Sequence, residues 1–205
     1  MALATAPASK TVYPSLPQTE TWPPQGRWTY DDFLRLPDDG VRYEIIEGVL
    51  HMTNAPDPEH QFAVTQILFA LEAASRASKL GVVLTSPIEV HLSVRTRPVQ
   101  PDVLFIAEAR RGIIGKKIIE GAPDLIVEVL SPSTLRADRT VKFEAYQQAG
   151  VREYWIANPK TRTIEVYTLA PDGYEVHGEF GPDEEVTSLG LPELKFLAET
   201  VFTRA

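Results

Sequence analysis

One stretch of sequence decides the fold class: Pro123-Asp-Leu-Ile-Val-Glu128-Val-Leu-Ser-Pro-Ser-Thr134. Its middle part, from Leu125 to Leu130, is apolar at every position except Glu128. A run that is apolar on both faces is typical of a central strand that is covered on both sides. A carboxylate in such a strand is costly unless a cation, a metal ion or hydrogen-bond donors compensate its charge. Glu128 is therefore a candidate functional residue.

A second carboxylate stands in front of another strand of the same kind. Asp102 follows Pro101 and precedes the apolar run from Val103 to Ile106. Paired carboxylates on neighbouring strands are what a Mg²⁺ or Mn²⁺ site needs, because these cations take oxygen ligands and keep water positions for a substrate phosphate. We expect Asp102 and Glu128 to bind one or two such ions.

These residues also have structural interpretations. Glu128 can form an ion pair with Arg139 or Lys142, and Asp102 can simply close a turn after a proline at the start of its strand. Lys142 follows Asp138 by four residues, so the two can form an exposed pair on a helix. Alternatively, Lys142 reaches over the strand end, where its ammonium group would orient a water nucleophile or neutralise a phosphate.

Outward from these strands, the sequence predicts a mixed sheet flanked by helices. Residues 42–52 are typical of a β-hairpin whose turn contains Glu47. A long helix is expected over residues 58–79, after an N-cap at Asp57 and with apolar positions at helical spacing. A second helix is expected over residues 138–148. This order of elements predicts one α/β domain with an added N-terminal hairpin.

Length and composition narrow the class of protein further. The chain has 205 residues and no cysteine, which excludes disulfides, thiolate zinc sites and cysteine nucleophiles. Residues 1–27 are rich in proline and are expected to form a disordered tail before a domain over residues 28–205. The net charge of −8 repels polyanions, so nucleic-acid binding needs a local basic patch or bound cations. A leader and a membrane-span pattern are both missing, which favours a cytoplasmic protein.

Several common catalytic motifs are absent from the sequence. It contains no G-x-S-x-G, no G-x-G-x-x-G and no P-loop, and its histidines lack the H-E-x-x-H spacing. These absences argue against a serine hydrolase, a dinucleotide enzyme, a P-loop enzyme and a zinc protease. By spacing alone, Glu47 in the hairpin turn and His60 in the first turn of the long helix are ordinary surface residues.

Taken together, the motifs resemble a known family, the bacterial family named putative restriction endonucleases, within the PD-(D/E)xK nuclease superfamily. The resemblance covers roughly residues 29–200. It is carried by the following segments: Arg42-Tyr-Glu-Ile-Ile-Glu-Gly-Val-Leu, Pro58-Glu-His60, Pro101-Asp102, the stretch from Pro123 to Thr134, Asp138-Arg-x-x-Lys142, Tyr146 and Gly150-Val-Arg-Glu-Tyr-Trp155.

The resemblance implies a restriction-endonuclease-like fold and Mg²⁺-dependent hydrolysis of DNA phosphodiester bonds. It implies Asp102 and Glu128 as metal ligands, with Glu47 and His60 lining the site. In the superfamily motif a lysine stands two residues after the glutamate, but Leu130 occupies that position here. Some superfamily members supply the lysine from the following helix, which makes Lys142 the candidate in this chain.

Two further expectations concern partners, and two alternatives to an enzyme stay open. A basic strip in the segment between the two carboxylate strands is expected to contact DNA, unless it is a solvated loop; its residues are Arg110, Arg111, Lys116 and Lys117. A nuclease of this size that cuts both strands is expected to act as a homodimer. The alternatives to an enzyme are a catalytically inactive DNA- or partner-binding module that keeps the fold, and a structural subunit whose carboxylates only form ion pairs.

Overall fold

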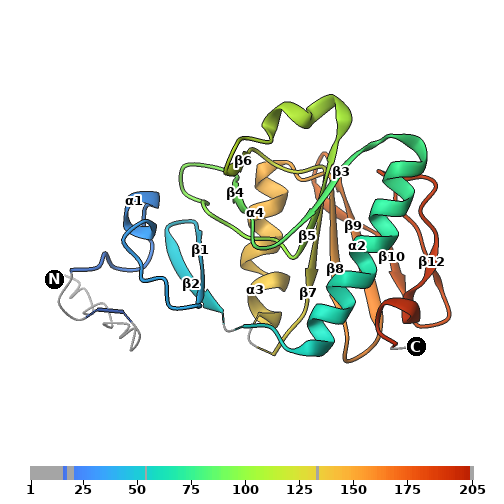
Figure 1. The fold of residues 1–205 in the computed structure, drawn as a ribbon, viewed down its shortest axis with the longest axis horizontal. Helices are drawn as coiled ribbons and strands as arrows, with labels where there is room; N and C mark the ends of the chain where they lie inside the picture. Colours follow the sequence, from blue (N-terminus) through green and yellow to red (C-terminus); the bar gives the residue numbers. More distant parts are fainter. Residues whose placement is uncertain (1–15, 18–20, 54, 133, 204–205) are drawn as a thin grey trace, which may run out of the picture.

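The computed structural model describes residues 16–17, 21–53, 55–132 and 134–203. Its centre is a six-stranded sheet with the strand order β10-β9-β8-β7-β5-β3 (Figure 1). The strands are β3 (Gly81–Thr85), β5 (Val103–Ala107), β7 (Leu125–Val129), β8 (Glu153–Asn158), β9 (Thr163–Ala170) and β10 (Gly173–Phe180). β7 and β8 run parallel, whereas the other neighbouring strands run antiparallel. The predicted mixed sheet is confirmed.

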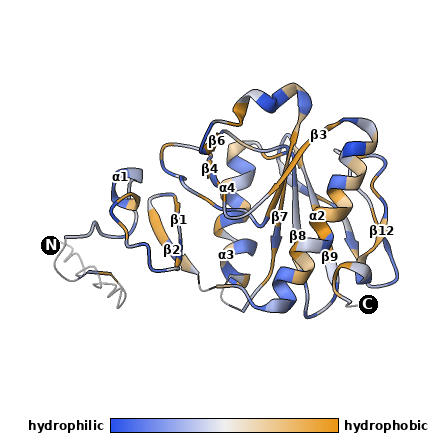
Figure 2. Ribbon diagram, viewed as in Figure 1, coloured by the Kyte–Doolittle hydropathy of each residue, from blue (hydrophilic) through white to orange (hydrophobic). Residues whose placement is uncertain are grey.

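Helices cover both faces of this sheet because its central strands are apolar on both sides. α2 (Pro58–Ser78) packs on one face, together with Val127 of β7. α4 (Val141–Ala149) packs on the other face, together with Ile126. Figure 2 shows hydrophobic central strands, and hydrophobic and hydrophilic stripes that alternate along α2. Since side chains alternate along a strand, Glu128 lies on the face that α4 covers.

The second predicted helix is interrupted near its start. We expected one helix over residues 138–148, but α3 (Leu135–Arg139) and α4 are separated by Thr140. The Thr140 hydroxyl donates a hydrogen bond of 2.7 Å to the carbonyl of Arg136, and its φ of −130° and ψ of −80° leave the helical region. The prediction of one continuous helix is wrong here, whereas the end of the helix at Gly150 is confirmed.

The predicted hairpin is formed by β1 (Arg42–Ile46) and β2 (Val49–Thr53). Glu47 and Gly48 make the turn with φ values of 50° and 72°, in the left-handed region that two-residue hairpin turns require. The hairpin and α1 (Tyr30–Phe33) stand beside the sheet, next to α3 and α4 (Figure 1).

Short elements complete the described chain. They are β4 (Glu89–His91), η1 (Glu108–Ile113), β6 (Ile118–Glu120), β11 (Glu185–Val186), β12 (Phe196–Leu197) and η2 (Ala198–Val201). β4 pairs with β6, and β11 pairs with β12. None of the helices in the described ranges is both long and apolar enough to cross a membrane.

The expected tail, residues 1–27, lies largely outside the described residues. The part that is described packs against the hairpin. Leu16 and Trp28 are buried in one cluster with Tyr43, and Trp22 stacks on Trp28 with the ring centroids 5.5 Å apart. In the described chain, packed structure therefore begins ahead of residue 28, where we expected the domain to start.

Candidate active site

Asp102 and Glu128 lie side by side at one end of the sheet. β5 and β7 are antiparallel with Val103 opposite Val127, so the next residues, Asp102 and Glu128, are neighbours across the pair. Asp102 Oδ2 accepts a hydrogen bond of 2.9 Å from the backbone N–H of Val129. Each of the two carboxylate residues is only 2% exposed. The structure thus brings the two predicted metal ligands together.

Asp102 is held by groups from the hairpin and from α2. The Arg42 guanidinium donates to Oδ1 from Nη2 at 3.1 Å and from Nη1 at 3.3 Å. His60 places Nε2 3.1 Å from Oδ2, and the helix cap fixes its position, because its backbone N–H donates to Asp57 at 2.8 Å. Burial by itself raises the pKa of Asp102, but the hydrogen bond from His60 and the charges of Arg42 and Lys142 outweigh it and lower the pKa.

Glu128 has a different balance of burial and charge. Its Oε1 accepts hydrogen bonds from Lys142 Nζ at 2.9 Å and from the Tyr146 hydroxyl at 2.6 Å. Lys142 and Tyr146 are four residues apart on α4, so both project from the same helix face. Burial raises the pKa of Glu128 to about 8, although the Lys142 ammonium acts in the opposite direction. A cation that binds Glu128 therefore competes with a proton over much of the neutral range.

Lys142 is enclosed by three carboxylates. Its Nζ lies 2.9 Å from Glu128, 3.1 Å from Glu44 and 3.6 Å from Asp138. Burial opposes the charge of Lys142, but the carboxylates outweigh it and hold the pKa well above its ordinary value. Asp138 and Lys142 are both buried, so the interpretation of this pair as an exposed one is wrong.

The hairpin reaches the cluster through Glu44 and not through Glu47. Glu44 Oε1 accepts a hydrogen bond of 2.6 Å from the backbone N–H of Gln100, and its Oε2 faces Lys142. Glu47, which we expected to line the site, instead pairs with Arg95 at 3.1 Å, and its side chain is 48% exposed. Glu47 follows the last residue of β1, so the strand alternation that directs Glu44 inward no longer applies to it. This corrects the expectation for Glu47.

The buried cluster contains more negative than positive groups. Four carboxylates face two permanent cations, Arg42 and Lys142; the carboxylates are those of Glu44, Asp102, Glu128 and Asp138. Within the described residues, no three His, Asp or Glu side chains are arranged as they stand to hold a metal ion. These oxygen donors nevertheless fit a divalent cation in type, and with all four carboxylates ionised they would carry an excess of two negative charges. Asp102 and Glu128, adjacent in the sheet, are the residues that would hold it.

Comparison with protein families then identifies the chain. A family model named Uma2 and described as "Putative restriction endonuclease" matches residues 30–199. The chain belongs to the Uma2 family. A solved structure, described as a putative nuclease belonging to DUF820 from Anabaena variabilis, has a TM-score of 0.70 and 21% sequence identity, and the match covers 85% of this chain and 97% of that one. At this identity the likeness shows the fold. No curated protein matches the chain.

In this Uma2 chain, two adjoining cavities lie at the edge of the carboxylate cluster. One has a volume of about 260 Å³, and Arg42 is among the residues that line it. The other has a volume of about 370 Å³, and Lys160 is among its lining residues. His60 and Ser131 line both cavities. His60 Nδ1 is buried and has no hydrogen-bond partner within the described part of the chain. The cavities therefore give a ligand a place next to the group that holds Asp102.

The basic strip of the Uma2 chain lies at the opposite end of the sheet. It follows the last residue of β5, whereas the carboxylate cluster lies before the first residue of that strand (Figure 1). Two of its four cations are in ion pairs: Arg110 lies 2.9 Å from Asp124, and Arg111 lies 3.2 Å from Glu108. The strip is therefore not part of the site that the carboxylates form.

Proposed function

We propose that this Uma2 protein is a metal-dependent endonuclease that hydrolyses DNA phosphodiester bonds. The observation that carries the proposal is the position of Asp102 and Glu128, adjacent in the sheet, with Lys142 2.9 Å from Glu128. Two carboxylates and a lysine are the side chains that the superfamily motif requires. In this chain the lysine comes from α4, because Leu130 occupies its usual position.

A Mg²⁺ or Mn²⁺ ion held by Asp102 and Glu128 would polarise the scissile phosphate and lower the pKa of the attacking water. The residues of the chain perform the remaining tasks. Lys142 stays protonated, so its ammonium can donate hydrogen bonds to a water or to a phosphate oxygen. Arg42 faces the cavity beside Asp102 and can donate to a second phosphate oxygen. His60 fixes the orientation of Asp102.

A second candidate is a catalytically inactive module that binds DNA or a protein partner. It is favoured by one observation: Asp102 already accepts hydrogen bonds from Arg42, His60 and the backbone of Val129, so a metal ion has to displace some of them. We include a homodimer in the nuclease proposal, since each chain offers one such site and cleavage of both strands needs two. The proposal also includes a cytoplasmic location.

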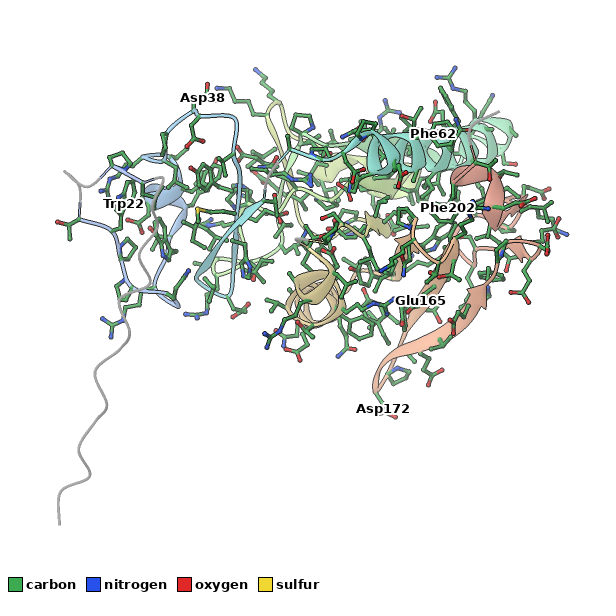
Figure 3. The ribbon with its side chains drawn as sticks, turned by 90° about the horizontal axis from the view of Figure 1, so that it is seen from below. Trp22, Asp38, Phe62, Glu165, Asp172 and Phe202 are labelled. Atoms are coloured by element: carbon green, nitrogen blue, oxygen red, sulfur yellow. The ribbon has the colours of Figure 1, made fainter. Side chains whose placement is uncertain are left out.

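Digestion of supercoiled plasmid separates the two candidates. The wild-type protein is expected to nick and linearise the plasmid with Mg²⁺ or Mn²⁺ and to leave it intact with a chelator. Asp102→Asn is expected to abolish cleavage, whereas Asp172→Asn, in the exposed turn labelled in Figure 3, should cut like the wild type. Binding of DNA without cleavage under all metal conditions would support the inactive module instead.

A further inference from the structure

Strand β1 has two faces with different partners. Arg42 and Glu44 point toward the carboxylate cluster, where they contact Asp102 and Lys142. The alternate residues of the strand, of which Tyr43 is one, are buried in a separate apolar cluster on the other side. The same strand therefore connects the candidate active site to whatever packs on its outer face.

The outer face of the hairpin is covered by residues 21–29, which we call the outer segment. The side chain of Gln25 pairs with β2 as another strand would, since its Oε1 accepts from the Leu50 N–H at 2.7 Å and its Nε2 donates to the Leu50 carbonyl at 3.0 Å. The Trp28 N–H donates to the Gly48 carbonyl at 2.9 Å. Trp22 lies on the side of the hairpin that faces away from the sheet (Figure 3).

Contact between the outer segment and the hairpin turn is close. A Cβ added at Gly48 would lie 2.7 Å from the carbonyl oxygen of Gly26, so only glycine allows this approach. Gly48 also has a φ of 72°, which disfavours other residues. The whole outer segment, residues 21–29, precedes the Uma2 match, which begins at residue 30.

We propose that the outer segment is a brace that positions Arg42 and Glu44 in the active site. The inference rests on the proposed nuclease function. The hairpin carries two of the charged groups that contact Asp102 and Lys142, and the outer segment holds the hairpin from behind through Gln25. A displacement of about 1 Å in a group that orients reacting residues can lower a rate up to about 100-fold. The outer segment thus acts on catalysis without contacting the substrate.

The test compares Gln25→Ala with Gln148→Ala, a control at an exposed position near the end of α4. Cleavage is measured under steady-state conditions, with hydrogen exchange of the metal-free proteins in parallel. For Gln25→Ala we expect kcat to fall on the order of tenfold with KM unchanged, because the brace lies behind the site. Exchange at the Gln100 N–H, which donates to Glu44, should rise on the order of tenfold. The control should change neither quantity.

Each other outcome decides a different question. A lower melting temperature for Gln25→Ala with kcat and Gln100 exchange both unchanged would mean that the segment only adds stability, and would overturn the proposal. If the wild-type protein does not cleave DNA, the proposed function fails. The Gln100 exchange rate then still shows whether the brace sets the position of Glu44, and an unchanged rate overturns the inference by itself.

Discussion

Lys142 Nζ lies 2.9 Å from Glu128 Oε1, although the two residues are fourteen positions apart and belong to different elements. Glu128 is in a central strand, and Lys142 is on the helix that covers this face of the sheet. The helix break at Thr140 separates α3 from α4, so Asp138 contributes to the cluster from one helix and Lys142 from the other. This arrangement supplies a buried ammonium where the superfamily motif has a lysine on the strand itself.

The stability of the protein is expected to fall as the pH rises from about 5 to about 8. An ordinary glutamate carboxyl, as in the unfolded chain, has a pKa of 4.5, whereas the pKa of Glu128 in the folded protein is about 8. The folded protein therefore keeps a proton that the unfolded chain releases in this pH range. This contribution is complete below pH 4.5 and is lost as the pH approaches 8. It amounts to a few kcal/mol, since each pKa unit corresponds to about 1.4 kcal/mol.

Urea unfolding at several pH values measures this slope. Glu128→Gln should flatten it, because the amide does not titrate, whereas Glu144→Gln, at an exposed position of α4, should leave it as in the wild type. A slope that persists unchanged in Glu128→Gln would show that another group is responsible.

Affinity for Mg²⁺ is expected to change with pH in the opposite sense. A metal ion at Glu128 has to displace the proton, so the apparent affinity should rise by about tenfold per pH unit between pH 6 and 8 and level off above the pKa. Isothermal titration calorimetry checks this without any DNA. An affinity that is the same at pH 6 and pH 8 would argue against Glu128 as a ligand.

Two glutamates of the hairpin provide a matched pair of variants. Glu44→Gln removes a buried carboxylate that contacts Lys142 and the Gln100 N–H, so we expect the cleavage rate to fall at least tenfold. Glu47→Gln changes an exposed pair with Arg95, which contributes less than about 1 kcal/mol, and the rate should stay within about twofold. Equal rates for the two variants would contradict the assignment of Glu44 to the site.

Much of the fold could be predicted from local patterns. The all-apolar run around Glu128 identified a central strand, and the turn at Glu47 identified the hairpin. The break at Thr140 escaped prediction, because a threonine that bonds back to a carbonyl is compatible with a continuous helix as well. The mixed sheet was predicted from the order of the expected elements, and the family from the resemblance of the motifs.

The sequence pointed directly to a residue of the candidate site only where a single carboxylate stands within or beside an apolar strand, as for Glu128 and Asp102. Asp102 lies beside Glu128 in the sheet, and Lys142 contacts Glu128. Glu44 carries the same signal as Glu128, a single charge in an otherwise apolar run, but the resemblance implied Glu47 as the hairpin glutamate of the site. Arg42 gives no such signal, because a residue at the edge of a hairpin is usually exposed, and only the tertiary structure brings it to Asp102.

The alternative ion pair of Glu128 with Arg139 is not formed. Arg139 instead pairs with Glu165 on β9, which lies on the same face of the sheet as Glu128 but two strands away. By charge and by distance along the chain, either Arg139 or Lys142 could pair with Glu128. The position across the sheet decided between them, because Arg139 reaches Glu165 on β9 whereas Lys142 reaches Glu128 on β7.

The cleavage rate of Lys142→Ala tests the central claim most directly. Compared with the wild type on supercoiled plasmid with Mg²⁺, the variant is expected to lose about 10²–10⁴ in rate, the range for a positioned group that transfers or orients a proton. Calorimetry should show that it still binds Mg²⁺, and circular dichroism that it is folded. The double variant Leu130→Lys with Lys142→Ala should recover part of the rate. A folded Lys142→Ala protein that cuts DNA at the wild-type rate would contradict the account.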